Sequence, residues 1–252
     1  MKALFFIITC LVSIGCRHTP ATTDKTVPPV IHTTVPQQAK LSLEYKVRTP
    51  TITTEDTPVL FLLHGLGSNE KNFFDLAQQV DGRMLVISAR APISLSADRY
   101  SWYNLSRDNK GWSYKDAEVL EASEKLIAFV SEIKKKHKVS GPVYLGGFSQ
   151  GAIMSLGTAL RHPDKIKGAI SLSGQLYSAF LDNHRRNYSQ LEILVTHGNN
   201  DKVLPVRIMK ENVKTLINKG LNPEVHYFDS EHTISRENYS AFINWLKQSL
   251  DK

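Results

Sequence analysis

The chain is organised around the sequence VYLGGFSQGA, residues 143–152, in which an apolar run ends abruptly in Gly-x-Ser-x-Gly. The run suits a buried strand, and apolar residues at helical spacing follow it. A direct turn from strand to helix forces Ser149 into a strained backbone conformation, so Gly147 and Gly151 must lack bulk. The hydroxyl is then held at the start of a helix, where free N–H groups favour a developing oxyanion. A Gly/Ser-rich turn in an ordinary parallel sheet remains an alternative.

Strand-like and helix-like segments alternate from residue 41 onward. This pattern predicts an α/β fold with a mostly parallel, twisted sheet and helices on both faces. Residues 41–48 alternate apolar and polar side chains, as an edge strand does, and residues 89–112 read as a long loop. The other predicted strands are 59–63, 84–87, 143–148, 166–172, 193–196 and 225–228, and the predicted helices are 73–80, 117–136, 150–162, 206–219 and 239–246.

Residues suited to nucleophilic chemistry follow several predicted strands, and the carboxyl ends of parallel strands meet at one edge of a sheet. A serine hydroxyl needs a base beside it, and the base needs a carboxylate to orient it. Ser149, His232 and Asp201 each lie just after a strand and are predicted to fill these roles in acyl transfer. The backbone N–H groups of Leu66 and Gln150 are predicted to bind the oxyanion.

Other carboxylates compete with Asp201 for the role of orienting the base. Asp229 and Glu231 are too close in sequence to His232 to reach round its ring, and Asp182 does not follow a strand. Asp201 follows the turn-forming residues 198–200 and is therefore favoured. An aspartate that only caps a helix is the alternative.

Composition argues against several other kinds of chemistry. Both cysteines, Cys10 and Cys16, lie in the first sixteen residues, so the folded part has no disulfide and no thiolate. No His/Asp/Glu cluster has ligand spacing, so a catalytic metal site is not expected. The net charge is +7, but the basic cluster 134–138 ends a predicted helix and has no interleaved aromatic residues, so nucleic acid is not an expected partner. His64 and His197 each precede a glycine and are expected to hydrogen-bond loop backbone.

The amino terminus predicts export. Met1-Lys2 precedes a compact apolar stretch, and the run 12–16 ends in Gly-Cys, similar to the lipobox of bacterial lipoproteins. Residues 1–16 are therefore interpreted as a lipoprotein-type signal peptide with Cys16 as the lipidation site, which would anchor the protein to a membrane in the periplasm or at the surface. Residues 17–40 are rich in threonine and proline and predict a disordered tether before a catalytic domain, 41–252. A plain signal peptide is the alternative.

Four motifs in register resemble the phospholipase/carboxylesterase family, which includes the acyl-protein thioesterases. They are LHGLG at 63–67, GFSQGA at 147–152, LSG at 172–174 and HGNND at 197–201. The resemblance implies a cofactor-free serine hydrolase of α/β-hydrolase fold without a large cap domain. It assigns Ser149, Asp201 and His232 to the catalytic triad and Leu66 and Gln150 to the oxyanion hole.

The resemblance also places Trp102, in the segment Ser-Trp-Tyr, beside the acyl site, although simple loop packing of Trp102 is an alternative. Glu231 departs from the glycine usual in the family, and an exported location favours small-molecule or lipid esters over intracellular acyl-proteins. A catalytically silent binding protein and a serine peptidase are the competing functions. The oligomeric state and the acyl chain length stay open.

Overall fold

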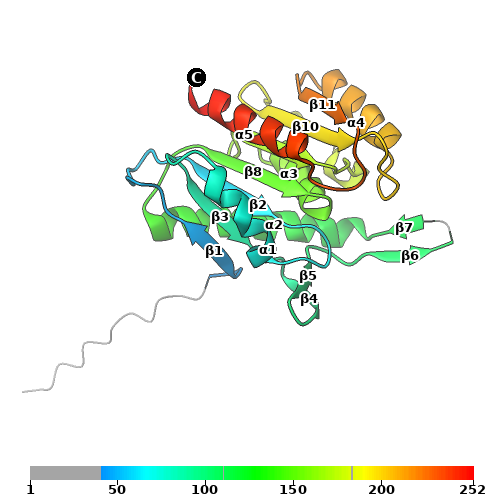
Figure 1. Cartoon of the computed structure of the whole chain (residues 1–252), viewed down its shortest axis with the longest axis horizontal. Coiled ribbons are helices and arrows are strands. Elements are labelled where there is room, and N and C mark those ends of the chain that lie inside the picture. Colours follow the sequence, from blue (N-terminus) through cyan, green and yellow to red (C-terminus); the bar gives the residue numbers. More distant parts are fainter. Residues whose placement is uncertain (1–40, 110, 183) are drawn as a thin grey trace, which may run out of the picture. The chain divides into compact units, whose positions relative to one another are not determined.

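The computed structural model describes residues 41–109, 111–182 and 184–252, so the predicted signal peptide, Cys16 and tether lie outside it (Figure 1). In this part a seven-stranded sheet has the order β1-β3-β2-β8-β9-β10-β11, and every neighbouring pair is parallel except β1 with β3. The predicted edge strand is confirmed as β1. The strands are β1 (Tyr45–Arg48), β2 (Val59–Leu63), β3 (Leu85–Ala89), β8 (Val143–Phe148), β9 (Gly168–Leu172), β10 (Glu192–Gly198) and β11 (Glu224–Phe228).

Helices cover both faces of this sheet, as predicted. They are α1 (Glu70–Phe74), α2 (Asp116–His137), α3 (Gln150–Arg161), α4 (Val206–Asn218) and α5 (Arg236–Leu250), with short 3-10 turns at Asp75–Gln79 and Ser178–Phe180. Side chains along a strand alternate between faces. In β2, Phe61 and Leu63 therefore join the cluster under α2, α3 and α4, whereas Leu60 and Leu62 join the cluster under α1 and α5.

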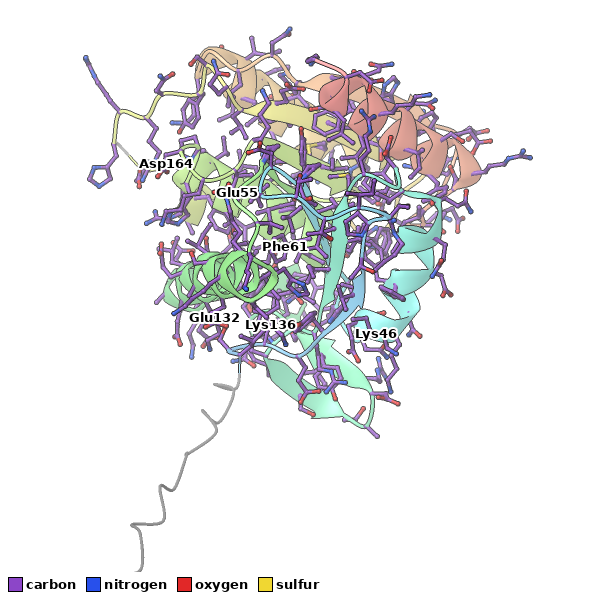
Figure 2. The ribbon with its side chains drawn as sticks, turned by 90° about the vertical axis from the view of Figure 1, so that its left-hand side faces the viewer. Lys46, Glu55, Phe61, Glu132, Lys136 and Asp164 are labelled. Carbon is purple, nitrogen blue, oxygen red and sulfur yellow. The ribbon has the colours of Figure 1, made fainter. Side chains whose placement is uncertain are left out.

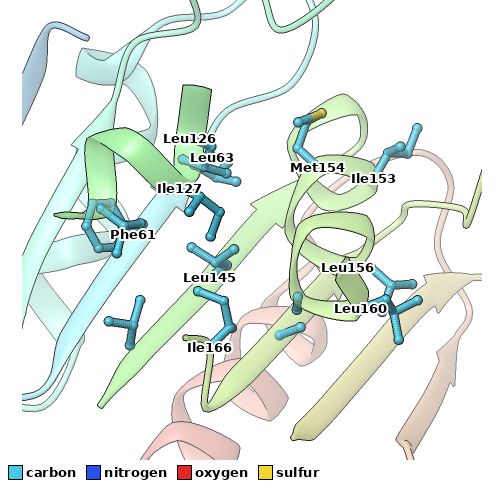
Figure 3. Packing of buried hydrophobic residues seen from close by; sticks show 14 of the residues in the cluster. Phe61, Leu63, Leu126, Ile127, Leu145, Ile153, Met154, Leu156, Leu160 and Ile166 are labelled. Carbon is cyan, nitrogen blue, oxygen red and sulfur yellow. The ribbon is translucent and has the colours of Figure 1, made fainter. Parts of the chain in front are cut away.

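The larger cluster forms the core that supports the Gly-x-Ser-x-Gly turn. Figure 3 shows Phe61 and Leu63 of β2 and Leu145 of β8 beneath α2 and α3. Every residue of β2 is buried, which suits a strand covered on both faces. The fold is therefore an α/β fold of the doubly covered parallel type.

The prediction of a plain loop over residues 89–112 is wrong. Two hairpins occupy this region: β4 (Ile93–Ser96) pairs with β5 (Arg99–Ser101), and β6 (Ser106–Asp108) pairs with β7 (Gly111–Ser113). Strands this short carry too few residues to show a period, so only their pairing partners reveal them. In Figure 1 the β4–β5 hairpin lies below the sheet and the β6–β7 hairpin projects to the right, away from the body, and both belong to the same compact unit as the sheet.

The parallel strands β2, β8, β9, β10 and β11 all end at one edge of the sheet, from which the functional loops emerge. Figure 2 views the molecule from the opposite edge, where Glu55 and Asp164 lie in the loops that lead into β2 and β9. Within the described residues, no helix combines the length and the apolar character needed to cross a bilayer.

Candidate active site

Ser149 occupies a sharp turn between β8 and α3, with φ 54° and ψ −116°. Such a conformation is strained for a residue with a Cβ, and it persists only where the surroundings enforce it. The two flanking glycines are required because a side chain at either position would clash with nearby backbone. A Cβ on Gly147 would lie 2.3 Å from the Gly151 carbonyl, and one on Gly151 would lie 2.0 Å from the Leu63 carbonyl oxygen. The spacing read from the sequence thus reflects close backbone contact at this turn.

Three side chains that are far apart in sequence form one hydrogen-bonded chain. His232 Nε2 lies 2.9 Å from Ser149 Oγ, and His232 Nδ1 lies 2.7 Å from Asp201 Oδ2. Because a carboxylate only accepts, Nδ1–H donates to Asp201, and Nε2 is left to accept the serine proton. Asp201 is buried and the His232 ring is mostly buried, so water competes little for these bonds.

The Asp201 carboxylate also holds its own loop. Its Oδ1 accepts hydrogen bonds from the backbone N–H groups of Val203 and Leu204, both at 2.8 Å. The capping alternative is wrong, because α4 begins after Pro205 and no side chain caps it. Oδ1 instead holds the loop before α4, and Oδ2 accepts from His232. Of the rival carboxylates, Asp229 accepts from the Asn200 side chain at 2.6 Å, and Asp182 pairs with Arg161 and Arg186.

Close backbone contact brings the aspartate loop and the histidine loop together. The Asn199 N–H donates to the Phe228 carbonyl at 2.8 Å, and the Asn200 N–H donates to the Ser230 carbonyl at 3.0 Å. A Cβ on Gly198 would lie only 2.3 Å from the Ser230 carbonyl oxygen. Glycine at this position therefore lets Asp201 and His232 meet.

The predicted oxyanion donors flank Ser149. Gln150 is the first residue of α3, and an N–H in the first helical turn has no acceptor within the helix. Leu66 lies in the loop after β2, where a Cβ on the neighbouring Gly65 would lie 3.5 Å from Ser149 Cβ. Gly67, on the other side of Leu66, has a φ of 72°, a value that favours glycine. The segments that carry the two predicted donors thus approach Ser149 from different elements, and their role as donors stays a prediction.

The side chain of Gln150 has a role that the sequence did not reveal. It is buried, its Nε2 donates to the Tyr103 carbonyl at 3.0 Å, and its Oε1 accepts from the Trp102 N–H at 2.9 Å. Trp102 is 2% exposed, and its indole N–H donates to the His64 carbonyl at 2.9 Å. Trp102 therefore links the loops that carry the two donors, and its role beside an acyl chain stays a prediction.

His64 and His197 bind loop backbone, as predicted. His64 accepts from the Ala91 N–H at 3.1 Å and lies 2.8 Å from the Gly65 carbonyl, to which Nδ1–H donates. His197 Nε2 donates to the Leu204 carbonyl at 2.7 Å and lies 3.2 Å from Asp201 Oδ2, a contact that the sequence did not predict. Burial lowers the pKa of both imidazoles, so each is neutral near pH 7.

No group of three or more metal-ligating side chains comes together in the part of the chain that the structure covers. The arrangement that does come together is a serine, an imidazole and a carboxylate with two adjacent backbone donors. Such an arrangement can carry out acyl transfer through a serine nucleophile.

Comparisons with known proteins agree with this fold. The family model described as Phospholipase/Carboxylesterase matches residues 48–250. Acyl-protein thioesterase 1 of Mycosarcoma maydis is 30% identical over 79% of this chain and 91% of its own length. The enzyme of the same name in Yarrowia lipolytica is 26% identical over 81% of this chain and 96% of its own length.

Solved structures give the same result. Esterase PE8 superposes with a TM-score of 0.70 at 25% identity, covering 82% of this chain and 98% of the esterase. A Bacillus cereus carboxylesterase, at 20% identity, has the same fold with a TM-score of 0.68 over 82% of this chain and 94% of its own. The fold and these likenesses define an α/β-hydrolase. The chain belongs to the phospholipase/carboxylesterase family and is a hydrolase of the carboxylesterase and phospholipase type.

Proposed function

We propose that the protein cleaves carboxylic esters, and thioesters of similar size, through an acyl-enzyme on Ser149. The observation that carries this proposal is the chain of two hydrogen bonds from Ser149 through His232 to Asp201. The Ser149 oxygen attacks the carbonyl carbon, and the hydroxyl proton passes to His232 Nε2. The tetrahedral oxyanion is bound by the N–H groups of Leu66 and Gln150.

The second half of the cycle uses the same residues. His232 returns its proton to the departing alcohol or thiol, which leaves an acyl group on Ser149. A water then gives a proton to His232 and attacks the acyl carbon. Collapse of the second tetrahedral intermediate breaks the bond to Ser149 Oγ, which takes the proton back from His232 as the carboxylic acid leaves. Asp201 stabilises the imidazolium in both halves and holds its ring orientation.

A fluorophosphonate probe and an ester panel of increasing acyl length test this mechanism. We expect the wild-type protein to be labelled and to hydrolyse the shorter esters, and Ser149→Ala to do neither. The competing functions predict other outcomes. A silent binding protein would fold yet neither label nor turn over any ester, and a serine peptidase would cleave peptides in preference to esters.

We also propose that the protein is exported and tethered to a membrane through Cys16. The supporting observation is the amino-terminal pattern, a short basic start, an apolar run and Gly-Cys, followed by a Thr/Pro-rich stretch. Labelled palmitate should enter the wild-type protein in bacterial cells and should not enter Cys16→Ser. No incorporation in the wild-type protein would leave only a plain signal peptide, and equal incorporation in both proteins would show that Cys16 is not the lipidated residue.

A further inference from the structure

Strand β5 is fastened to the loop that carries the Leu66 donor. The Gly67 N–H donates to the Tyr100 carbonyl at 2.8 Å, and the Tyr100 N–H donates to the Ser68 carbonyl at 3.0 Å. These two bonds form an isolated β-bridge between Ser68 and Tyr100. The position of Arg99, the first residue of β5, is therefore fixed relative to Leu66.

Alternation along β5 places the Arg99 side chain on the same face of the strand as Ser101. Tyr100 points to one face, where the Arg90 guanidinium lies 4.7 Å from its ring centre. Ser101 points to the other face, where its Oγ accepts from Gln150 Nε2 at 3.0 Å. Arg99 precedes Ser101 by two residues and so shares the face on which Gln150 and the start of α3 lie.

The guanidinium of Arg99 packs against the backbone beside Leu66. Its Nη2 lies 3.0 Å, and its Nε 3.3 Å, from the position that a Cβ on Gly67 would occupy. The positive charge thus stands one residue away from a proposed oxyanion donor. Gly67 is needed for its positive φ, and the guanidinium lies in the space that its missing Cβ leaves open.

The neighbouring acids already have partners. Asp98 pairs with Lys71 at 2.9 Å, and Glu70 pairs with Arg90 at 2.7 Å. Arg99 is exposed, and among the described residues no carboxylate comes within ion-pair distance of it. An exposed guanidinium without a counter-charge at the rim of a catalytic site can bind an anion supplied by the substrate.

We propose that Arg99 binds an anionic oxygen group of the substrate, so that the preferred ester carries a carboxylate or a phosphate near the scissile carbonyl. The inference rests on the proposed esterase function and adds the charge of the substrate to it. A planar guanidinium bonds two oxygens of such a group at once, which gives both affinity and orientation. A neutral ester of the same size lacks this contact.

Two pairs of esters test the proposal at both ends of the substrate. Phenyl pentanoate and monophenyl glutarate differ by a carboxylate at the end of the acyl chain, and para-tolyl butyrate and para-carboxyphenyl butyrate differ by one on the alcohol. Release of acid, followed in a pH-stat, gives kcat/KM for each. For wild type we expect about a tenfold preference for the anionic member of at least one pair, as a charge-assisted hydrogen bond supplies.

Substitutions assign this preference to one residue. Arg99→Gln should reduce the anionic-to-neutral ratio about tenfold, chiefly through KM, and Arg99→Lys should keep part of it. Arg185→Gln is the matched control. It removes the same charge from an exposed position at the far end of α3, where the neighbouring Arg186 donates to the Arg161 carbonyl. The anionic-to-neutral ratio of this variant should match that of wild type. Added salt should weaken the preference in wild type.

The outcomes separate this proposal from the esterase function itself. If wild type hydrolyses none of the four esters, the proposed function fails. If wild type hydrolyses both members of each pair at the same rate, or if Arg99→Gln changes kcat/KM equally for both members, the protein is an esterase and Arg99 only packs against Gly67. The latter two results would overturn the inference.

Discussion

Gly198 offers the sharpest test of how the site is assembled. An alanine Cβ at this position would lie 2.3 Å from the Ser230 carbonyl oxygen and 2.5 Å from that of Glu231. Both atoms belong to the backbone, so no side chain can rotate out of the way. To reach even 3.0 Å, the two loops must separate by at least 3.0 − 2.3 = 0.7 Å. Since His232 follows Glu231 directly, this movement stretches the 2.7 Å bond between His232 and Asp201.

The expected consequence is a large loss of activity with a smaller loss of stability. Displacement of a catalytic group by about 1 Å lowers the rate about 100-fold. Overpacking of a tight contact costs about 1–3 kcal/mol. We therefore expect Gly198→Ala to fold, to melt at a lower temperature than wild type, and to show a kcat for a short-chain ester reduced about 100-fold.

Gly82→Ala is the matched control, because the nearest atom to its new Cβ is Thr51 Oγ1 at 3.9 Å, an ordinary contact. This variant should keep the kcat and the melting temperature of wild type. The reasoning is refuted if Gly198→Ala also keeps the wild-type kcat, since the close approach of the two loops would then be irrelevant to catalysis. It is equally refuted if both variants lose activity to the same extent.

Two further substitutions probe the supports of the oxyanion loop. The Arg90 guanidinium lowers the pKa of Glu70 from its usual 4.5, so this pair stabilises the fold fully above about pH 4.5 and loses its contribution as the pH falls through the lower, folded-state value. Glu70→Gln should lower the free energy of unfolding by about 1–2 kcal/mol at pH 7, and its melting temperature should fall less steeply than that of wild type as the pH is lowered. The same dependence of melting temperature on pH in both proteins would contradict this. Trp102→Phe removes the donor to the buried His64 carbonyl and should cost about 1–3 kcal/mol together with a lower kcat, whereas a wild-type melting temperature and kcat would show that the bond does not support the site.

The parts of the fold that the sequence predicted well are those with a strong period or a steric requirement. Continuous apolar runs such as 59–63 gave strands close to their observed bounds, because a strand covered on both faces has no polar positions. Gly147 and Gly151 marked the turn at Ser149, because no other residue fits beside the crossing backbone. Both signals are local, so a single sequence suffices to read them.

The parts that escaped prediction depend on partners distant in sequence. The hairpins within residues 89–112 are pairs of short strands without a period, and one of them is fixed by bonds to the loop after β2. Gln150 was predicted only as a backbone donor, because nothing in its neighbourhood indicates that its side chain reaches residues 101–103. The sequence likewise gave no sign that His197 lies within 3.2 Å of Asp201.

These unpredicted contacts have one consequence for how the site works. β5 and the residues after it bond to both segments that carry the proposed oxyanion donors: Tyr100 bonds to Gly67 and Ser68 in the Leu66 loop, and Trp102 bonds to the Gln150 side chain. The segment that carries Arg99 is therefore also the segment that connects the two loops of the proposed oxyanion hole. An anion bound by Arg99 would interact with the same strand that contacts the proposed oxyanion hole. The proposed charge recognition and the proposed oxyanion hole thus depend on one hydrogen-bonded segment, and a segment held in this way keeps a reacting group in a fixed geometry.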